Sequence, residues 1–561
     1  MSHLQETYAY HRQLEPLGVF LRHQRKTILL AGCAFAALML AAILLIDPAF
    51  FYPRVQTDPL NYWLKAKQLV EHGNTAARWA VNVPPFPYAA MPGILRTPAL
   101  LLSHEFDTQL RIMQLMNIPI AAGVAIMSAY ILSWSQPRHR HAAVILFAFA
   151  FMILTPVWMA NLLLPLVDAP YAFFTLAAVL LARAIVCSDD RLRDQKLNLS
   201  LFAVFFAISF GLRFTAPAVI LFAGVLARGR WSHGSIPRRT MFIAAGAAIA
   251  LTGILVLANA EAIFGRYFSE PLFFLRDASK PAMIANLLGV ALPSQIIPGF
   301  SLGFTQPPIE GLRTVHFAET ARDTAWLVVG FAISTVILTG MWRMRRRLLA
   351  EVVYVLVPMP LLALVLPSTT RYVMTYEPFL WLFFYFGAVA LGQRLHIDGK
   401  TLARNRLALS AIAVAAACGV IGLRMWRSAG TAGPQSVAIR LTRAPDYISD
   451  VSRTFRHLRA YLETLPRDSV LLVGQWGTSG RWSLISGMRY YYPDSGLTAA
   501  ARLVPVYVLA ECGTQETCQI PGELAAYVRK QIGKWGDFTY KREFIYVTPN
   551  ANAQVYRIIP R

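Results

Sequence analysis

Charged residues are scarce in this chain, and acidic residues are the scarcest. Lys, Arg, Asp and Glu make up 15% of its 561 residues, whereas an average soluble domain contains about 25%. Apolar residues account for 56% of the chain. This balance excludes disordered, fibrous and small disulfide-bonded proteins, and it argues against a single soluble domain. It is typical of a protein that crosses a membrane many times.

The basic excess does not indicate nucleic-acid binding. The chain has 53 Lys and Arg against 30 Asp and Glu, a net charge of +23. Its arginines stand in short groups beside apolar runs and do not form one basic face. Positive charge beside apolar segments is typical of the cytoplasmic loops of membrane proteins. The expected partners of this charge are therefore membrane lipids and no nucleic acid.

Motifs of several enzyme classes are missing. The chain has no Walker A motif and no HExxH, which argues against an ATPase or a metalloprotease. Its five cysteines include no CxxC pair. Cys512 and Cys518 are six residues apart, and an oxidising compartment would permit a disulfide between them. Two free thiols are the alternative, and a nucleotide cofactor is not expected.

Long apolar runs, in contrast, are abundant. A span needs roughly 20 apolar residues to cross a core of about 30 Å. Such runs lie at residues 27–46, 112–134, 142–160, 165–187, 240–260, 324–343, 350–367, 372–393 and 405–424. The stretch 198–228 is either one long helix or two short helices meeting at residues 211–217. All the basic loops face the cytoplasm only if this stretch crosses twice, with Arg213 at its outer apex. The pattern predicts 11 spans, with the N-terminus inside and the C-terminus outside.

The predicted organisation has three parts. Residues 1–26 form a cytoplasmic N-terminus that leads into a signal anchor, because the acidic leading residues and the long apolar run do not fit a cleaved signal peptide. Residues 27–427 form the membrane module, with external loops at 47–111 and 261–323. Residues 428–561 form a periplasmic α/β domain, with a helix at 451–464 and strands at 470–474, 504–510 and 544–548. The fold class is thus an α-helical polytopic membrane protein with a C-terminal α/β domain.

Two acidic residues at the outer ends of spans are the first candidates for chemistry, because charge near a membrane is costly and usually functional. Asp58 follows the first span, and Asp168 opens the fourth. On a helix running to about His72, Asp58 shares one face with Tyr62 and Lys65. That stripe could hold an acceptor hydroxyl and a phosphate together. The alternatives are helix capping by both aspartates and a snorkelling Lys65.

Cations on the outer side also invite explanation. Arg213 and the pair Arg371 and Tyr372 lie at outer span ends, where positive charge is disfavoured. A guanidinium matches a lipid phosphate in bidentate geometry, and interfacial snorkelling is the alternative. The loop at 292–311 is rich in Pro, Gly and Phe, which fits either a binding lid or an ordered surface loop.

Five elements follow one another along the chain. They are Asp58 near the start of a large first loop, a proline-rich stretch at 84–88, the segment 168–174, the turn at 211–213, and Arg371-Tyr372 followed by Pro378. Together, and in this order, they resemble the bacterial GT-C glycosyltransferases, the superfamily of protein mannosyltransferase-like enzymes and the aminoarabinose transferase of lipid A. The resemblance covers roughly residues 27–393.

The resemblance implies a membrane enzyme that passes a sugar from a polyprenyl-phosphate carrier to an envelope glycan, lipid or protein. It makes Asp58 the general base and Asp168 a second acidic site residue. Lys65, Arg213, Arg371 and Tyr372 are the candidates for the donor phosphate, and Tyr62 for the substrate. In the aminoarabinose branch a lysine precedes the paired prolines, where Val83 stands here, so Arg78 or Arg96 could replace that cation. Some branches use a divalent metal, and the sequence offers no distinctive ligands beyond the two aspartates.

Two other functions compete with this interpretation. A transporter or flippase would be expected to show repeated halves and charges at the membrane midplane. The chain shows no repeat, and its notable acids lie at span ends. A non-catalytic assembly factor of envelope polysaccharide synthesis would tolerate Asp58→Asn. We expect the C-terminal domain to position the acceptor.

Overall fold

The structure is a computed structural model, and the residues it describes are dominated by helices. These residues are 3–54, 58–72, 90–164, 166–188, 195–213, 215–232, 284–297, 300, 304, 321–359, 373–394, 445–466, 469–473, 489–491, 505–512, 538–547 and 552–560. The predicted spans at 240–260 and 405–424, and most of the loop at 261–323, lie outside them.

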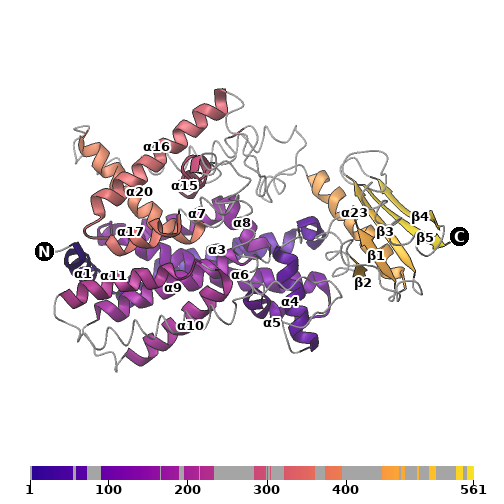
Figure 1. Cartoon of the computed structure of the whole chain (residues 1–561), viewed down its shortest axis with the longest axis horizontal. Coiled ribbons are helices and arrows are strands. Elements are labelled where there is room, and N and C mark those ends of the chain that lie inside the picture. Colours follow the sequence, from indigo (N-terminus) through magenta and orange to yellow (C-terminus); the bar gives the residue numbers. More distant parts are fainter. Residues whose placement is uncertain are drawn as a thin grey trace. The chain divides into compact units, whose positions relative to one another are not determined.

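The helical elements follow one another along the chain in the order shown in Figure 1. They are α1 (His3–Gln13), α2 (Leu17–His23), α3 (Arg25–Leu45), η1 (Pro48–Arg54), α4 (Asp58–His72), α5 (Ala90–Leu102), α6 (Phe106–Ser133), η3 (Arg138–Arg140), α7 (His141–Leu154), α8 (Pro156–Leu163), α9 (Asp168–Cys187), α10 (Lys196–Leu212), α11 (Ala218–Ser232), η6 (Leu287–Ala291), α15 (Leu292–Ile296), α16 (Ala321–Met344), α17 (Leu349–Leu356), η8 (Met374–Tyr376), α20 (Glu377–Arg394) and α23 (Pro445–Thr464).

Five of the described helices are long and apolar enough to cross a membrane. They are α3, α6, α9, most of α16, and η8 continued by α20. Large apolar side chains are open to the surroundings along α3 and α16, where Leu30 is 72% exposed and Trp342 is 68% exposed. Rows of such side chains suit contact with lipid. The described part of the chain is thus mainly helical and fits a membrane, while the total of 11 spans and their orientation stay predictions.

Two of the predicted apolar stretches are each divided into two helices. The stretch 198–228 is two helices, α10 and α11, which both pack against α9 (Figure 1). The break was predicted at residues 211–217. The run 142–160 was expected to be one helix and is two, because α7 ends at Leu154 and α8 begins at Pro156. Proline has no backbone N–H to continue a helix, and Thr155 before it is extended.

Helices α16 and α20 approach each other closely through glycine. A Cβ atom on Gly340 would overlap the carbonyl oxygen of Phe383, and one on Gly387 would overlap that of Val336. Small residues at such a contact let two apolar helices pack backbone to backbone.

The C-terminal part contains a five-stranded mixed sheet with strand order β2-β1-β3-β5-β4. Its strands are β1 (Val470–Val473), β2 (Arg489–Tyr491), β3 (Val506–Cys512), β4 (Phe538–Val547) and β5 (Asn552–Pro560). Strand β1 is parallel to β2 and β3, and β5 is antiparallel to β3 and β4. The helix and the three strands predicted for this region are present, and β2 and β5 complete the sheet.

The amphipathic helix α23 covers part of this sheet. Phe455, Leu458 and Leu462 are buried at helical spacing. The ring of Tyr461 stacks on that of Phe544 of β4, with centroids 4.6 Å apart.

The chain divides into two compact units that are not continuous in sequence. The first unit comprises residues 1–38, 117–161 and 167–432, and the second comprises 39–116, 162–166 and 433–561. The second unit therefore combines the predicted first external loop with the C-terminal sheet and α23. The side of the membrane on which this unit lies stays a prediction.

Candidate functional site

In the first unit, Asp168 lies at the start of α9 and is buried. The N-cap of this helix is Val167, and the helix start has no side-chain cap hydrogen bond. Asp168 therefore does not act as the helix cap that was the alternative interpretation. Its Oδ1 instead accepts a hydrogen bond from Arg213 Nη2, and the two form an ion pair. Its Oδ2 is buried and has no hydrogen-bond partner among the described residues.

Arg213 ends α10 and starts the connection to α11, in an extended backbone conformation. The next part of this connection also contacts α9, because the Thr215 hydroxyl lies 2.7 Å from that of Tyr171. Asp168 and Tyr171 are about one helical turn apart, so one face of α9 is bound twice by the α10–α11 connection. The structure thus brings together two predicted site residues, Asp168 and Arg213, from different helices.

A further buried carboxylate, Glu377, stands at the start of α20 in the same unit, and the sequence interpretation missed it. Its side chain is 3% exposed, and its Oε2 accepts a hydrogen bond of 2.6 Å from Trp158 Nε1. The segment before it, η8, packs against α9, the helix that begins with Asp168. The signal was available, because Glu377 is an acid at the end of an apolar run, as Asp168 is.

In the second unit, α4 begins at Asp58, as predicted, and ends at His72. Tyr62 and Lys65, which share the predicted stripe with Asp58, are buried, and Lys65 is only 4% exposed. The lysine therefore does not extend along a surface, which was the alternative interpretation. Burial lowers the pKa of Lys65 below its ordinary value.

Arg96 joins this group from α5, which packs against α4. Its side chain is 2% exposed, and its Nη2 donates a hydrogen bond of 2.5 Å to the carbonyl oxygen of Leu166. Burial lowers the pKa of Arg96 to about 10, and electrostatic interaction with Tyr62 opposes that shift. The two helices approach at Gly93, where an added Cβ would lie 2.8 Å from Lys65 Cβ. One helix pair therefore holds a phenol and two buried cations.

The other candidates cannot be placed. Arg78, Arg371, Tyr372 and the proline-rich stretch at 84–88 lie outside the described residues. Cys518 also lies outside them, so the disulfide to Cys512 stays a prediction. Among the residues that the structure describes, no group of three His, Cys, Asp or Glu side chains could hold a metal ion. Within each unit, the candidate residues that the structure describes are carboxylates, phenols and cations.

Comparisons with known proteins give a likeness in structure alone. No family model and no curated protein matches the chain. Among solved structures, the chain is similar to ArnT from Cupriavidus metallidurans bound to undecaprenyl phosphate, with 10% identity and a TM-score of 0.47 over 93% of this chain and 98% of that one. It is also similar to the Archaeoglobus fulgidus oligosaccharyltransferase tethered to an acceptor peptide, with 11% identity and a TM-score of 0.41 over 92% and 74%. At these scores neither likeness assigns a residue or an activity to this chain.

Proposed function

We propose that the chain is a GT-C-type glycosyltransferase of the bacterial inner membrane. It takes a sugar from a polyprenyl-phosphate donor and passes it to an envelope glycan, lipid or protein on the periplasmic face. The proposal rests on the sequence resemblance and on the charges gathered in the α4–α5 pair.

The observation that carries the proposal is that α4 begins at Asp58 and buries Lys65 seven residues later, beside the buried Arg96 of α5. Seven residues of helix rise about 10 Å, which is the span of a sugar and its phosphate. An acid and two cations on this helix pair match the two demands of the reaction. A base must remove a proton from the acceptor, and cations must stabilise a departing phosphate.

The proposed step is a single displacement. Asp58 takes the proton of the acceptor hydroxyl while that oxygen attacks the anomeric carbon of the donor sugar. The bond between the anomeric carbon and the phosphate oxygen breaks, and polyprenyl phosphate leaves with the electron pair. A positioned base typically contributes about 10²–10⁴ in rate. Lys65 and Arg96 stabilise the phosphate, and because both are buried, water screens their charges little. Displacement in one step inverts the anomeric carbon.

Asp168 and Arg213, in the first unit, keep the roles that the resemblance implies, a second acidic residue and a cation for the donor phosphate. Arg213 offers a planar fork of donors to the donor phosphate, and Asp168 holds it in position through the buried ion pair. As the resemblance implies, Arg371 and Tyr372 bind the donor phosphate and Arg78 binds the substrate. In this proposal the C-terminal region positions the acceptor, and the need for a divalent metal is left open.

The test is mass spectrometry of lipid extracts and envelope glycans from cells that lack this protein. We expect a polyprenyl-monophosphate sugar to accumulate and one envelope glycan, lipid or protein to lose that sugar. Wild type should restore both, and Asp58→Asn should restore neither. Glu105→Gln, the same kind of change at an exposed carboxylate, is the matched control and should restore both.

Two outcomes would overturn the proposal. If Asp58→Asn restores both products, Asp58 is not the base, and transport or assembly becomes the better interpretation. If no lipid-linked sugar accumulates in the deletion strain, the donor class is wrong.

A further inference from the structure

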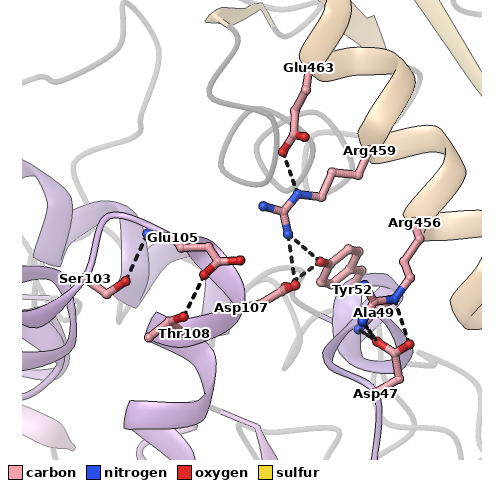
Figure 2. A network of polar contacts seen from close by, with 10 residues as sticks. All are labelled: Asp47, Ala49, Tyr52, Ser103, Glu105, Asp107, Thr108, Arg456, Arg459 and Glu463. Carbon is pink, nitrogen blue, oxygen red and sulfur yellow. Dashed lines mark hydrogen bonds and ion pairs between the residues drawn. The ribbon is translucent and has the colours of Figure 1, made fainter.

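Helix α23 is bound to the segment that leads into α4 by two arginines one turn apart. Figure 2 shows both arginines with the residues that they contact, which together are called the polar network. Arg456 donates two parallel hydrogen bonds to the Asp47 carboxylate, from Nε to Oδ2 and from Nη2 to Oδ1, each 2.8 Å long. Asp47 Oδ1 also accepts a hydrogen bond of 2.9 Å from the backbone N–H of Ala49, at the start of η1. Fork-to-carboxylate pairing fixes orientation as well as distance.

Arg459 makes the inner half of the network, at the other end of η1. Its Nη1 donates a hydrogen bond of 2.9 Å to the hydroxyl of Tyr52 and lies 3.0 Å from Asp107 Oδ2. Tyr52 in turn donates to Asp107 Oδ1, and Arg459 Nε donates to Glu463 on its own helix at 2.7 Å. The side chains of Arg459 and Asp107 are only 18% and 16% exposed, so water and salt screen this pair less than a surface pair.

The first turn of α6 connects this network to α4. Phe106 contacts Tyr52 edge to face on one side, with centroids 5.5 Å apart, and stacks on Trp63 on the other at 4.3 Å. Trp63 Nε1 donates a hydrogen bond of 2.9 Å to Gln109, also on α6. Trp63 lies on α4 between Tyr62 and Lys65, and only residues 55–57 separate η1 from Asp58. The start of α4 is thus held from η1 and from α6, and Arg459 contacts both.

We propose that Arg459 is a positioning residue for the start of α4, acting through Asp107 and Tyr52, with Arg456 as a second, outer support. This inference rests on the proposed function, because it gives the C-terminal helix a role in placing Asp58. The C-terminal region is then a structural part of the catalytic unit, in addition to any contact with the acceptor.

The test compares Arg459→Gln, Arg459→Lys and the control Arg542→Gln, an exposed arginine on β4. Hydrogen exchange is measured on the purified full-length protein in detergent, over residues 48–66. We expect several-fold faster exchange there in Arg459→Gln, partial recovery in Arg459→Lys, which keeps a cation for Asp107, and no change in Arg542→Gln. Sugar transfer in complemented cells should fall roughly 10–100-fold in Arg459→Gln, because small displacements of a reacting group cost about that much.

Swapping the two charges of the outer pair distinguishes a lost contact from misfolding. Arg456→Asp and Asp47→Arg should each speed hydrogen exchange over residues 48–54, and the double variant should restore slow hydrogen exchange and sugar transfer. Unchanged exchange over 48–66 in Arg459→Gln would overturn the inference. So would faster exchange with full transfer, since the contact would then not position the base. If Asp58→Asn is active, the proposed function fails, whereas the exchange experiment still decides whether α23 holds α4. If Arg459→Gln does not accumulate, Arg459→Lys decides the question, and wild-type hydrogen exchange together with full transfer in that variant would overturn the inference.

Discussion

Replacing Arg213 by methionine is expected to destabilise the first unit, because Asp168 would keep a buried charge without its cation. The two side chains are 13% and 2% exposed. Removing one partner of a buried ion pair typically costs about 3–5 kcal/mol. The measurement is thermal unfolding of the purified protein in detergent. The double variant Asp168→Asn, Arg213→Met should recover most of the loss, and a double variant as unstable as the single one would contradict this account.

Asp47 gives the contact between α23 and η1 a dependence on pH. Burial raises the pKa of Asp47, but the hydrogen bonds from Arg456 and the Ala49 N–H lower it by more. The pKa of Asp47 therefore lies below the ordinary value of 3.8. A carboxyl with a depressed pKa stabilises the folded contact above its unfolded pKa, and this contribution is lost as the pH falls through the folded pKa. We expect the protection of residues 48–54 against hydrogen exchange, corrected for the intrinsic pH dependence of amide exchange, to fall as the pH falls below 3.8. In Asp47→Asn, which has no carboxyl to titrate at this position, this change with pH should be absent.

Single residues were predictable where their charge stood out against an apolar background. Asp168 and Arg213 were both found from the sequence, but as separate candidates, because the pairing depends on how α9 and α10 pack. Glu377 carried the same signal and was missed, because it lies within the predicted span 372–393 and not at its first residue. The burial of Lys65 and Arg96 could not be read from the sequence at all, since it depends on Gly93 letting α5 approach α4.

At the scale of helices, the packing of α16 on α20 depends on the absence of two side chains. We expect Gly387→Leu to separate these helices and lower the unfolding temperature in detergent, because its Cβ would overlap the Val336 carbonyl oxygen. Gly224→Leu on α11 is the matched control, since a Cβ there meets nothing within 4 Å. If both variants unfold at the wild-type temperature, the close contact of α16 and α20 is wrong.

Helix existence was more predictable than helix continuity. Apolar length located α3, α6, α9, α16 and α20, because burial in lipid or protein needs long apolar runs. The charge rule predicted two helices over 198–228, and the structure has α10 and α11 there, while the double crossing of the membrane stays a prediction. The same rule gave no reason to split 142–160, where no charge interrupts the apolar run and only Pro156 marks the break.

For the whole molecule, topology is the prediction most open to test. Arg230 lies in the last turn of α11. A reporter fused after this residue should be cytoplasmic. A fusion after Asp47 should be external. The measurement is a pair of reporters that are active on opposite sides of the membrane. An external signal after Arg230 would undo the double crossing and invert every later span.

The division into two units was not predictable from the sequence. Composition places a boundary near residue 428, where apolar character ends, but α23 belongs to the same unit as the first external loop. That association depends on ion pairs and hydrogen bonds between segments about 400 residues apart, such as Asp47 and Arg456, whose positions differ by 409. No local pattern in either segment indicates its partner.

This separation has a consequence for biosynthesis. At about 5–20 residues per second, a ribosome needs roughly 20–80 s to make the residues between Asp47 and Arg456. Until then η1 lacks the contacts that Arg456 and Arg459 make with it, so these contacts form only after most of the chain has been made. If the proposed function holds, a premature stop codon after residue 427 would yield a chain with its membrane helices but without sugar transfer.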